Sequence, residues 1–168
     1  NFDQWKIGLA LYMTMRGIPQ FYYGTELLKK KKKAGNDGQR RGDFYGGWEN
    51  DSKNAFTKAG LTEQEKEAQV YFSKLLNWRK NNDVIHSGKF KHYAPQSNDV
   101  YVYFRYTESK KIMVILNKNK VKVSLDLSRY EEMIPDKFAA LDVISNKEIN
   151  ADNTLDITAK TAMILEIK

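Results

Sequence analysis

The sequence contains no cysteine, and this absence excludes several kinds of chemistry. A disulfide scaffold, a thiolate zinc site and a cysteine nucleophile all require that residue. The two histidines are too few for an all-histidine metal site. The cellular compartment stays open, because secreted proteins can also lack disulfides.

Long apolar segments are missing too. The mean hydropathy is −0.66, and no uninterrupted apolar run approaches the ~20 residues of a membrane span. The 168 residues, 41% of them hydrophobic, still suffice for one ordinary domain or two small ones. The chain starts at Asn1 rather than Met, with no signal peptide after it. We therefore expect a processed product or a piece of a longer protein.

The positive charge is concentrated in one run. The net charge is +7, and Lys29–Lys33 contribute five of these charges. A nucleic-acid-binding face usually spreads its basic residues among stacking aromatic side chains. An isolated lysine run is more typical of a solvated loop than of a phosphate-binding patch, so no nucleic-acid partner is expected. Steeply salt-dependent DNA affinity would identify this least favoured alternative.

The first half of the chain is predicted to contain two helices, one strand and a long loop. Asp3–Arg16 fits a helix capped by Asp3 and ended by Gly17. Its apolar residues cover nearly the whole circumference, so we expect structure outside this chain to bury it on several sides. Ile18–Tyr23 is predicted as one buried strand, and Gly24–Gly60 as a long loop.

The second predicted helix begins with a capping box that pairs Thr62 with Glu65 and ends near Asn81. Apolar residues at helical spacing form its core face: Ala68, Tyr71, Phe72, Leu75 and Leu76. After Asp83 the apolar period changes to two, and polar turns separate several short apolar segments. These segments are 100–104, 112–116, 121–127, 141–143, 155–157 and 162–167. Residues 83–168 are therefore predicted to form an antiparallel β-sandwich.

Few of the polar residues form a pattern that could carry chemistry. The carboxylates of the loop and its edges lack a rigid scaffold that would hold two of them ~5 Å apart, so they are interpreted as solvated. These carboxylates are Glu26, Asp37, Asp43, Glu49 and Asp51. Asn36–Gly38 lacks the remaining ligands of a calcium loop, and His86 with His92 supplies only two ligands. No metal and no cofactor are predicted.

Aromatic residues offer two candidate sugar contacts. Trp48 follows two glycines in the loop and either contacts a ligand or anchors the loop to its scaffold. Tyr101 and Tyr103 lie on one face of a predicted strand, where they either stack on sugar rings or pack at an interface. The sequence leaves both pairs of alternatives open.

Four stretches resemble the α-amylase superfamily of glycoside hydrolases. Gly17–Glu26 (GIPQFYYGTE) resembles the last barrel strand of that family. Gly42–Trp48 (GDFYGGW) and Asn54–Phe56 resemble the neopullulanase and cyclomaltodextrinase branch in its Bacteroidetes starch-utilisation form. Tyr71–Ile85 resembles the final barrel helix and its connection to a C-terminal β-sandwich. Together these likenesses extend over the whole chain.

The resemblance implies an α+β fragment. Residues 1–82 would be the end of a (β/α)8 TIM barrel, from its seventh to its eighth helix, and 83–168 the C-terminal sandwich. The family's retaining mechanism uses an Asp nucleophile, a Glu acid/base and a second Asp, all on earlier strands. None of them has a match here, so no catalytic residue is assigned and the chain alone is expected to be inactive. The loop would border the substrate cleft. The candidates there are Arg40, Arg41, Asp43 and Trp48.

The favoured function is thus the structural C-terminal part of a retaining α-glucan hydrolase acting on starch, pullulan or cyclodextrin-type substrates. Its partners would be an α-glucan and the remainder of the barrel, and the apolar residues 5–23 would favour self-association. The alternative is a carbohydrate-binding β-sandwich module that uses Tyr101 and Tyr103. A periplasmic or cell-surface location follows from the resemblance alone.

Overall fold

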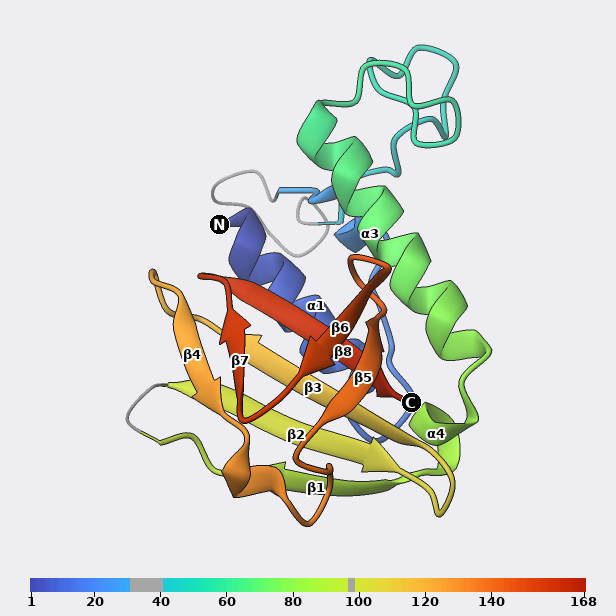
Figure 1. The fold of residues 1–168 in the computed structure, drawn as a ribbon. Coiled ribbons are helices and arrows are strands. Elements are labelled where there is room, and N and C mark those ends of the chain that lie inside the picture. Colours follow the sequence, from blue (N-terminus) through green and yellow to red (C-terminus); the bar gives the residue numbers. More distant parts are fainter. Residues whose placement is uncertain (31–40, 97–98) are drawn as a thin grey trace. The chain divides into compact units, whose positions relative to one another are not determined.

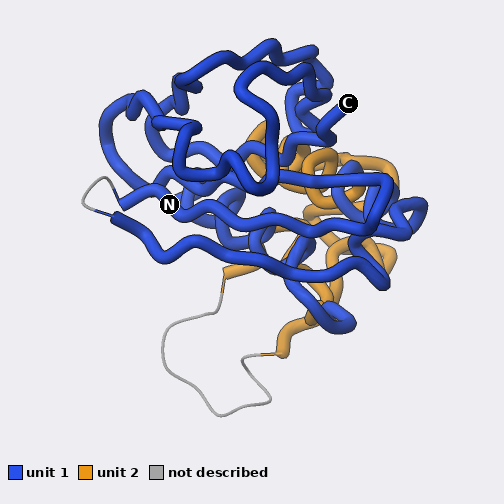
Figure 2. Tube along the Cα trace, turned by 60° about the horizontal axis from the view of Figure 1, so that its bottom comes forward, with its two compact units in different colours: residues 1–19, 74–168 blue, residues 20–73 orange. Residues whose placement is uncertain are grey.

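The computed structural model describes residues 1–30, 41–96 and 99–168. These residues form two compact units, one made of residues 1–19 and 74–168 and the other of residues 20–73 (Figure 2). The sheet, the first helix and the end of α3 (Glu63–Lys80) lie in the first unit. The domain boundary between residues 82 and 83 stays a prediction.

Antiparallel strands dominate the first unit, as predicted (Figure 1). Within the described residues, a six-stranded sheet has the order β1-β2-β3-β8-β5-β6, and a two-stranded sheet pairs β4 with β7. The strands are β1 (Lys89–Tyr93), β2 (Val100–Tyr106), β3 (Lys111–Asn117), β4 (Val123–Asp126), β5 (Phe138–Asp142), β6 (Lys147–Ala151), β7 (Thr154–Ile157) and β8 (Thr161–Ile167). The short helix α4 (Asp83–Ser87) precedes β1, and η2 (Ser128–Tyr130) lies between β4 and β5.

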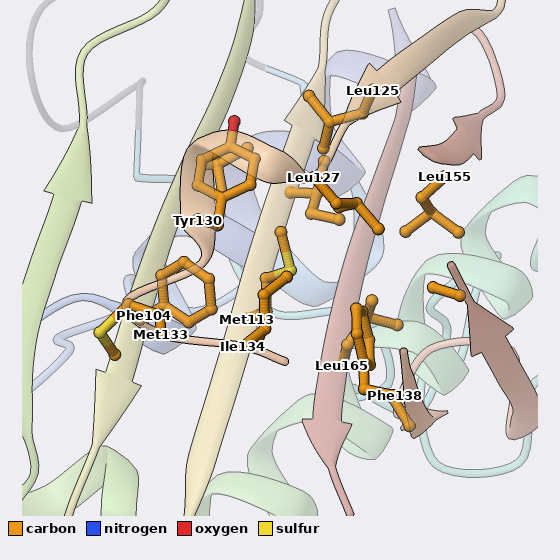
Figure 3. Close-up of a cluster of buried hydrophobic side chains, with 14 of the residues drawn as sticks. Phe104, Met113, Leu125, Leu127, Tyr130, Met133, Ile134, Phe138, Leu155 and Leu165 are labelled. Carbon is orange, nitrogen blue, oxygen red and sulfur yellow. The ribbon is translucent and has the colours of Figure 1, made fainter. Parts of the chain in front are cut away.

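The main core lies on one face of the six-stranded sheet. Period-two alternation brings Phe104, Met113 and Leu165 side by side across β2, β3 and β8. Side chains from the two-stranded sheet and η2 cover them (Figure 3). These covering side chains include Leu125, Leu127, Tyr130 and Leu155.

The opposite face of the sheet is covered by α1 (Phe2–Thr14), which lies against β3 and β8. Both faces of β2 and β3 are therefore buried, and Tyr103 and Ile112 are as inaccessible as the core residues. The buried side of α1 consists of Leu9, Ala10, Met13 and Thr14, spaced as one helical face. Tyr12, on another side of the helix, is exposed.

Two details of the predicted N-terminal elements are wrong. The helix is capped by Asn1, whose side chain accepts a hydrogen bond from the Asp3 amide at 3.0 Å, and not by Asp3. Residues 18–23 form no strand in the described chain, and Ile18 is almost fully exposed. An isolated apolar segment has no neighbouring strand to satisfy its backbone groups, so its β-forming composition is insufficient.

The helix predicted from Thr62 is confirmed. It is α3, and its buried face contains Ala68, Phe72 and Leu75. The edge strands β1 and β6 and the short α4 were not predicted, because their sequences lack an apolar period. Edge strands bury few side chains, so polar residues such as Lys89 and Lys147 are tolerated there.

Candidate functional site

Residues 41–60 of the second unit form a loop shaped by polar side chains. The Asp51 carboxylate accepts hydrogen bonds from the amides of Gly46 at 2.8 Å and Trp48 at 3.2 Å. Asn54 accepts from the amides of Phe56 and Thr57, both at 2.9 Å. Gly46 has φ 92° and lies against the Asn54 side chain, so a larger residue would be strained there.

A small apolar cluster anchors this loop within its unit. Leu27, Ala55 and Leu61 are buried together, and Phe44 and Tyr45 pack against them. Leu27 belongs to the short helix η1 (Thr25–Leu27). The loop therefore presents a fixed surface rather than a freely moving chain segment.

A group of rings lies on this unit, and we name Tyr22, Tyr23, Phe44 and Phe56 the loop aromatic surface. Phe44 is half-buried and the other three rings are exposed. Successive ring centroids are 4.4 Å apart for Tyr22 and Tyr23, 6.4 Å for Tyr23 and Phe44, and 5.8 Å for Phe44 and Phe56. Phe56 is 74% exposed and Tyr22 53%. Contiguous exposed rings are typical of a ligand or partner surface.

Lys29 is integrated into the loop and is not part of a solvated run. Its ammonium group donates hydrogen bonds to the carbonyls of Gly42 and Asp43 and lies over the rings of Tyr23 and Tyr45. Such cation–π contacts need a fixed cation. The solvated-loop interpretation is therefore wrong for Lys29, while Lys31–Lys33 lie outside the described residues.

Three of the four predicted cleft residues lie on the described loop. Arg41 and Asp43 are exposed, and their backbone carbonyls accept from the Tyr23 hydroxyl and from Lys29. The Trp48 side chain is 66% exposed although Asp51 holds its amide. Arg40 lies outside the described residues. The rings of Tyr22, Tyr23, Phe44 and Phe56 were not predicted as site residues, because two of them were assigned to a buried strand.

The two sheet tyrosines differ in accessibility. Tyr103 is fully buried, its hydroxyl is hydrogen-bonded to Thr14, and burial raises its pKa. Because a buried ring has no face for a sugar, Tyr103 is removed from the predicted stacking residues. Tyr101 is half-buried, with its ring 5.3 Å from that of Tyr103 and 6.2 Å from that of His92. Its role stays a prediction.

The described residues contain neither a cluster of three metal-ligating side chains nor a membrane-spanning helix. Across residues 1–30, 41–96 and 99–168, no three His, Cys, Asp or Glu side chains gather as metal ligands. Among the helices in these ranges, none has the length and apolar character to cross a bilayer.

The capping box of α3 also fixes the loop. Glu65 accepts from the Thr62 amide at 2.8 Å and from Lys53 at 2.6 Å, and its own amide donates to the Thr62 hydroxyl at 3.2 Å. Burial alone would raise the pKa of Glu65, but the hydrogen bonds from Lys53 and Thr62 outweigh it and the pKa is lowered. Glu65 thus joins the loop to the start of the helix as a carboxylate.

Replacing this carboxylate is expected to cause a pH-dependent loss of stability. The pKa of Glu65 is lower in the folded state than its ordinary value of 4.5. The carboxylate therefore stabilises the fold fully above pH 4.5, and this stabilisation is lost as the pH falls through the lower folded pKa. Glu65→Gln should lower the free energy of unfolding by about 1 kcal/mol at pH 7. Urea unfolding at pH 7 and pH 3 measures this loss of stability. Glu63→Gln, on the exposed side of the same helical turn, is the control. Equal losses at both pH values would contradict this role of the charge.

One comparison concerns both β-sheets of the first unit. Residues 90–166 match the family model described as the cyclomaltodextrinase (Cyclo-malto-dextrinase) C-terminal domain. The sheet unit resembles the C-terminal domain of α-amylase-family hydrolases. That match begins in β1 and ends in β8, so it includes every strand of the described chain.

Two curated relatives are similar over most of this chain. Alpha-amylase 3 of Dictyoglomus thermophilum is 25% identical over 138 residues, which is 73% of this chain and 27% of the relative. The amylopullulanase of Thermoanaerobacter thermohydrosulfuricus is 28% identical over 155 residues, which is 84% of this chain and 9% of the relative. The chain thus spans about a quarter or less of the relatives' length.

Solved structures share the fold. The α-amylase of Geobacillus thermoleovorans, solved with acarbose, has a TM-score of 0.74 at 17% identity over 99% of this chain and 33% of its own. AmyP E221Q, solved with maltotriose, has a TM-score of 0.73 at 16% identity over 99% of this chain and 35% of its own. Helices followed by an antiparallel sheet domain, as in the C-terminal region of α-amylases after the barrel, are therefore the fold of this chain.

Proposed function

We propose that this chain is the C-terminal part of a retaining α-glucan hydrolase and that its own role is structural. The observation that carries this proposal is the match of residues 90–166 to a cyclomaltodextrinase C-terminal domain. The likeness of residues 1–89 to α-amylase structures extends that support to the helices. In this proposal the catalytic Asp and Glu residues belong to a part of the protein outside these 168 residues.

Within this family, we assign the chain to the neopullulanase and cyclomaltodextrinase branch in its Bacteroidetes starch-utilisation form. The whole protein would then be located in the periplasm or at the cell surface. The assignment is supported by the motifs Gly42–Trp48 and Asn54–Phe56. The substrate would be starch, pullulan or a cyclodextrin, and relatives named alpha-amylase and amylopullulanase support an α-glucan substrate. Self-association through exposed apolar residues such as Tyr12 and Ile18 belongs to the same proposal.

The loop would supply sugar contacts in the whole enzyme. Trp48 is exposed on a segment fixed by Asp51, and Arg41 and Asp43 lie on the same loop. An exposed ring on a fixed backbone can stack on a sugar with little loss of conformational entropy. This proposal assigns binding to Trp48 and leaves the chemical step to other residues.

Hydrolysis assays of the whole protein test both parts of the proposal. We expect the whole protein to release reducing sugar from amylose, pullulan or α-cyclodextrin, and the 168-residue chain to release none. Trp48→Ala should raise KM about three- to tenfold with little change in kcat, because one stacking contact contributes about 0.5–1.5 kcal/mol. Val70→Ala, an exposed apolar change on α3, is the matched control. An inactive whole protein would contradict the proposal.

A second candidate is a sugar-binding module that uses the sheet. The observation in its favour is the partly exposed row formed by Phe90, His92 and Tyr101. Maltooligosaccharide binding by the chain that disappears in Tyr101→Ala would favour this alternative. Tyr103 is unsuitable for this test, because its removal would open the buried contact with α1.

A further inference from the structure

A hollow of about 370 Å³ is lined by residues of α4 and of the C-terminal end of β8. Figure 1 shows the C-terminus near α4. We call this cavity the α4–β8 hollow, and its volume is in the range of small-molecule sites. All of its lining belongs to the first unit: Asn81, Asn82, Asp83, Val84, Lys110, Lys111, Ile112, Leu141, Glu166, Ile167 and Lys168. None of these residues has a role in the function proposed above.

The hollow contains a carboxylate in an unusual place. Glu166 pairs with Ile112 on β3 and with Leu141 on β5, so it occupies an interior strand where apolar side chains are the rule. Its Oε1 accepts hydrogen bonds from the Trp78 indole at 2.7 Å and from the Asn82 amide at 3.0 Å. These two donors hold the carboxylate in one orientation, which makes it a fixed acceptor at the hollow.

One of the two donors is itself held in place. The Asn82 side-chain oxygen accepts from the Ile85 amide at 3.4 Å and caps α4. Its side-chain amide group therefore has a defined direction, with its nitrogen toward Glu166. The polar end of the hollow is assembled before any ligand arrives, and this lowers the entropy cost of binding.

Donors and an apolar wall complete the lining. The ammonium group of Lys110 is 3.2 Å from the Asp83 carboxylate at the rim, and both side chains are more than 60% exposed. Lys111 adds a further donor, while the ammonium group of Lys168 is paired with Glu148. The accessible apolar lining consists of Leu141 and Ile167, which are half-buried, whereas Val84 and Ile112 are almost fully buried.

This combination selects against several ligand classes. A phosphate would meet the Asp83 and Glu166 carboxylates, and a metal cation would meet Lys110 and Lys111, so like charges oppose both. A wholly apolar molecule would leave the fixed carboxylate without solvent or a new partner. A neutral ring with hydroxyl groups on its edge and C–H groups on its faces satisfies the acceptor, the donors and the apolar wall together.

We propose that the α4–β8 hollow binds one or two hexose units of an α-glucan. The hydroxyl groups would donate to Glu166 and accept from Lys110 and Lys111, while a sugar face would lie on Leu141 and Ile167. The identity of the sugar rests on the function proposed above; the preference for a neutral polyhydroxylated ring rests on the hollow itself.

Three tryptophans at separate places make this proposal measurable in the 168-residue chain. The Trp78 indole N–H is bonded at the hollow, Trp48 is on the loop and Trp5 is on α1. In ¹⁵N-labelled protein each indole gives its own NMR signal. Titration with maltotriose should shift the Trp78 signal with saturation at a Kd on the order of 1 mM, because few groups contact the sugar.

Two double variants of matched charge test the residues involved. Lys110→Ala with Lys111→Ala should weaken the binding reported by Trp78 at least threefold. Lys118→Ala with Lys120→Ala, just beyond the opposite end of β3, should leave it unchanged. Equal effects of the two pairs would assign the shift to general charge and overturn the site.

The remaining outcomes separate this proposal from the proposed function. A maltotriose shift at Trp48 without one at Trp78, or no shift at all, overturns the hollow as a sugar site. The same Trp78 shift with millimolar inorganic phosphate would identify an anion site and overturn the preference for a neutral ring. The hydrolase proposal is decided independently, by the activity of the whole protein.

Discussion

Replacing Arg105 with methionine is expected to lower the free energy of unfolding by about 2–4 kcal/mol, because buried carbonyls lose their donors. The Arg105 side chain is 1% exposed. Its guanidinium donates to the carbonyl of Thr14 at 3.1 Å and to that of Gly88 at 2.9 Å. Methionine fills a similar volume but donates to neither.

The reason for this arginine lies in α1. The last carbonyls of a helix have no partners within it and carry partial negative charge, and α1 has no basic residue in its own last turn. Arg79 supplies donors to the carbonyls of Met13 and Gly17, and Arg105 to that of Thr14. Burial lowers the pKa of Arg79 and of Arg105. Two cations from distant parts of the chain thus cap the helix, and Arg105 joins it to β2 of the sheet.

Urea unfolding followed by circular dichroism measures the effect. Arg16→Met is the matched control, because Arg16 is exposed at the same helix end and its replacement should change stability by less than about 0.5 kcal/mol. Arg105→Lys should be intermediate, since an ammonium group keeps the charge but lacks the planar fork. A loss below about 1 kcal/mol for Arg105→Met would refute the proposed capping.

Phe104→Ala is expected to cost about 3–5 kcal/mol, which is comparable to the whole stability of many small domains. The ring is fully buried, with centroids 5.9 Å from the Tyr93 ring and 6.1 Å from the Tyr130 ring. It lies between β1 and η2, where neither neighbour can close the cavity without losing its own contacts. Removing it should therefore loosen the edge strand β1 as well as the core.

Two controls accompany this variant in thermal and urea unfolding. Phe104→Leu keeps much of the volume and should lose about 1–2 kcal/mol, while Val121→Ala, 65% exposed, should lose almost nothing. Hydrogen exchange of the β1 amides should accelerate more in Phe104→Ala than in either control. A loss for Phe104→Ala no larger than that for Phe104→Leu would show that the core adapts to the smaller residue.

The parts of the fold that follow local rules could be predicted from the sequence. The capping box at Thr62, the helical face with Ala68 and Leu75, and the period-two segments of β2, β3 and β8 are each encoded within a few neighbouring residues. The strand predicted at 18–23 failed because pairing depends on a neighbour that the local sequence does not contain. The edge strands β1 and β6 were missed because their side chains remain half in solvent.

The candidate sites depend more strongly on residues far apart in the sequence. Trp48 could be singled out because an aromatic residue on a loop is a typical sugar or ligand contact. The accessibility of Tyr103 could not be judged, since Thr14, which covers its hydroxyl, lies 89 positions away. Glu166 attracted no attention for the same reason: Trp78 and Asn82 are 88 and 84 positions away.

The coding sequence directly upstream of the Asn1 codon tests the central claim most directly. If this chain is the C-terminal part of a retaining α-glucan hydrolase, the reading frame continues upstream. It should then encode the earlier strands of a (β/α)8 barrel, with an Asp nucleophile, a Glu acid/base and a second Asp preceded by His. A start codon immediately before Asn1 would contradict the claim and leave sugar binding by the chain itself as its function.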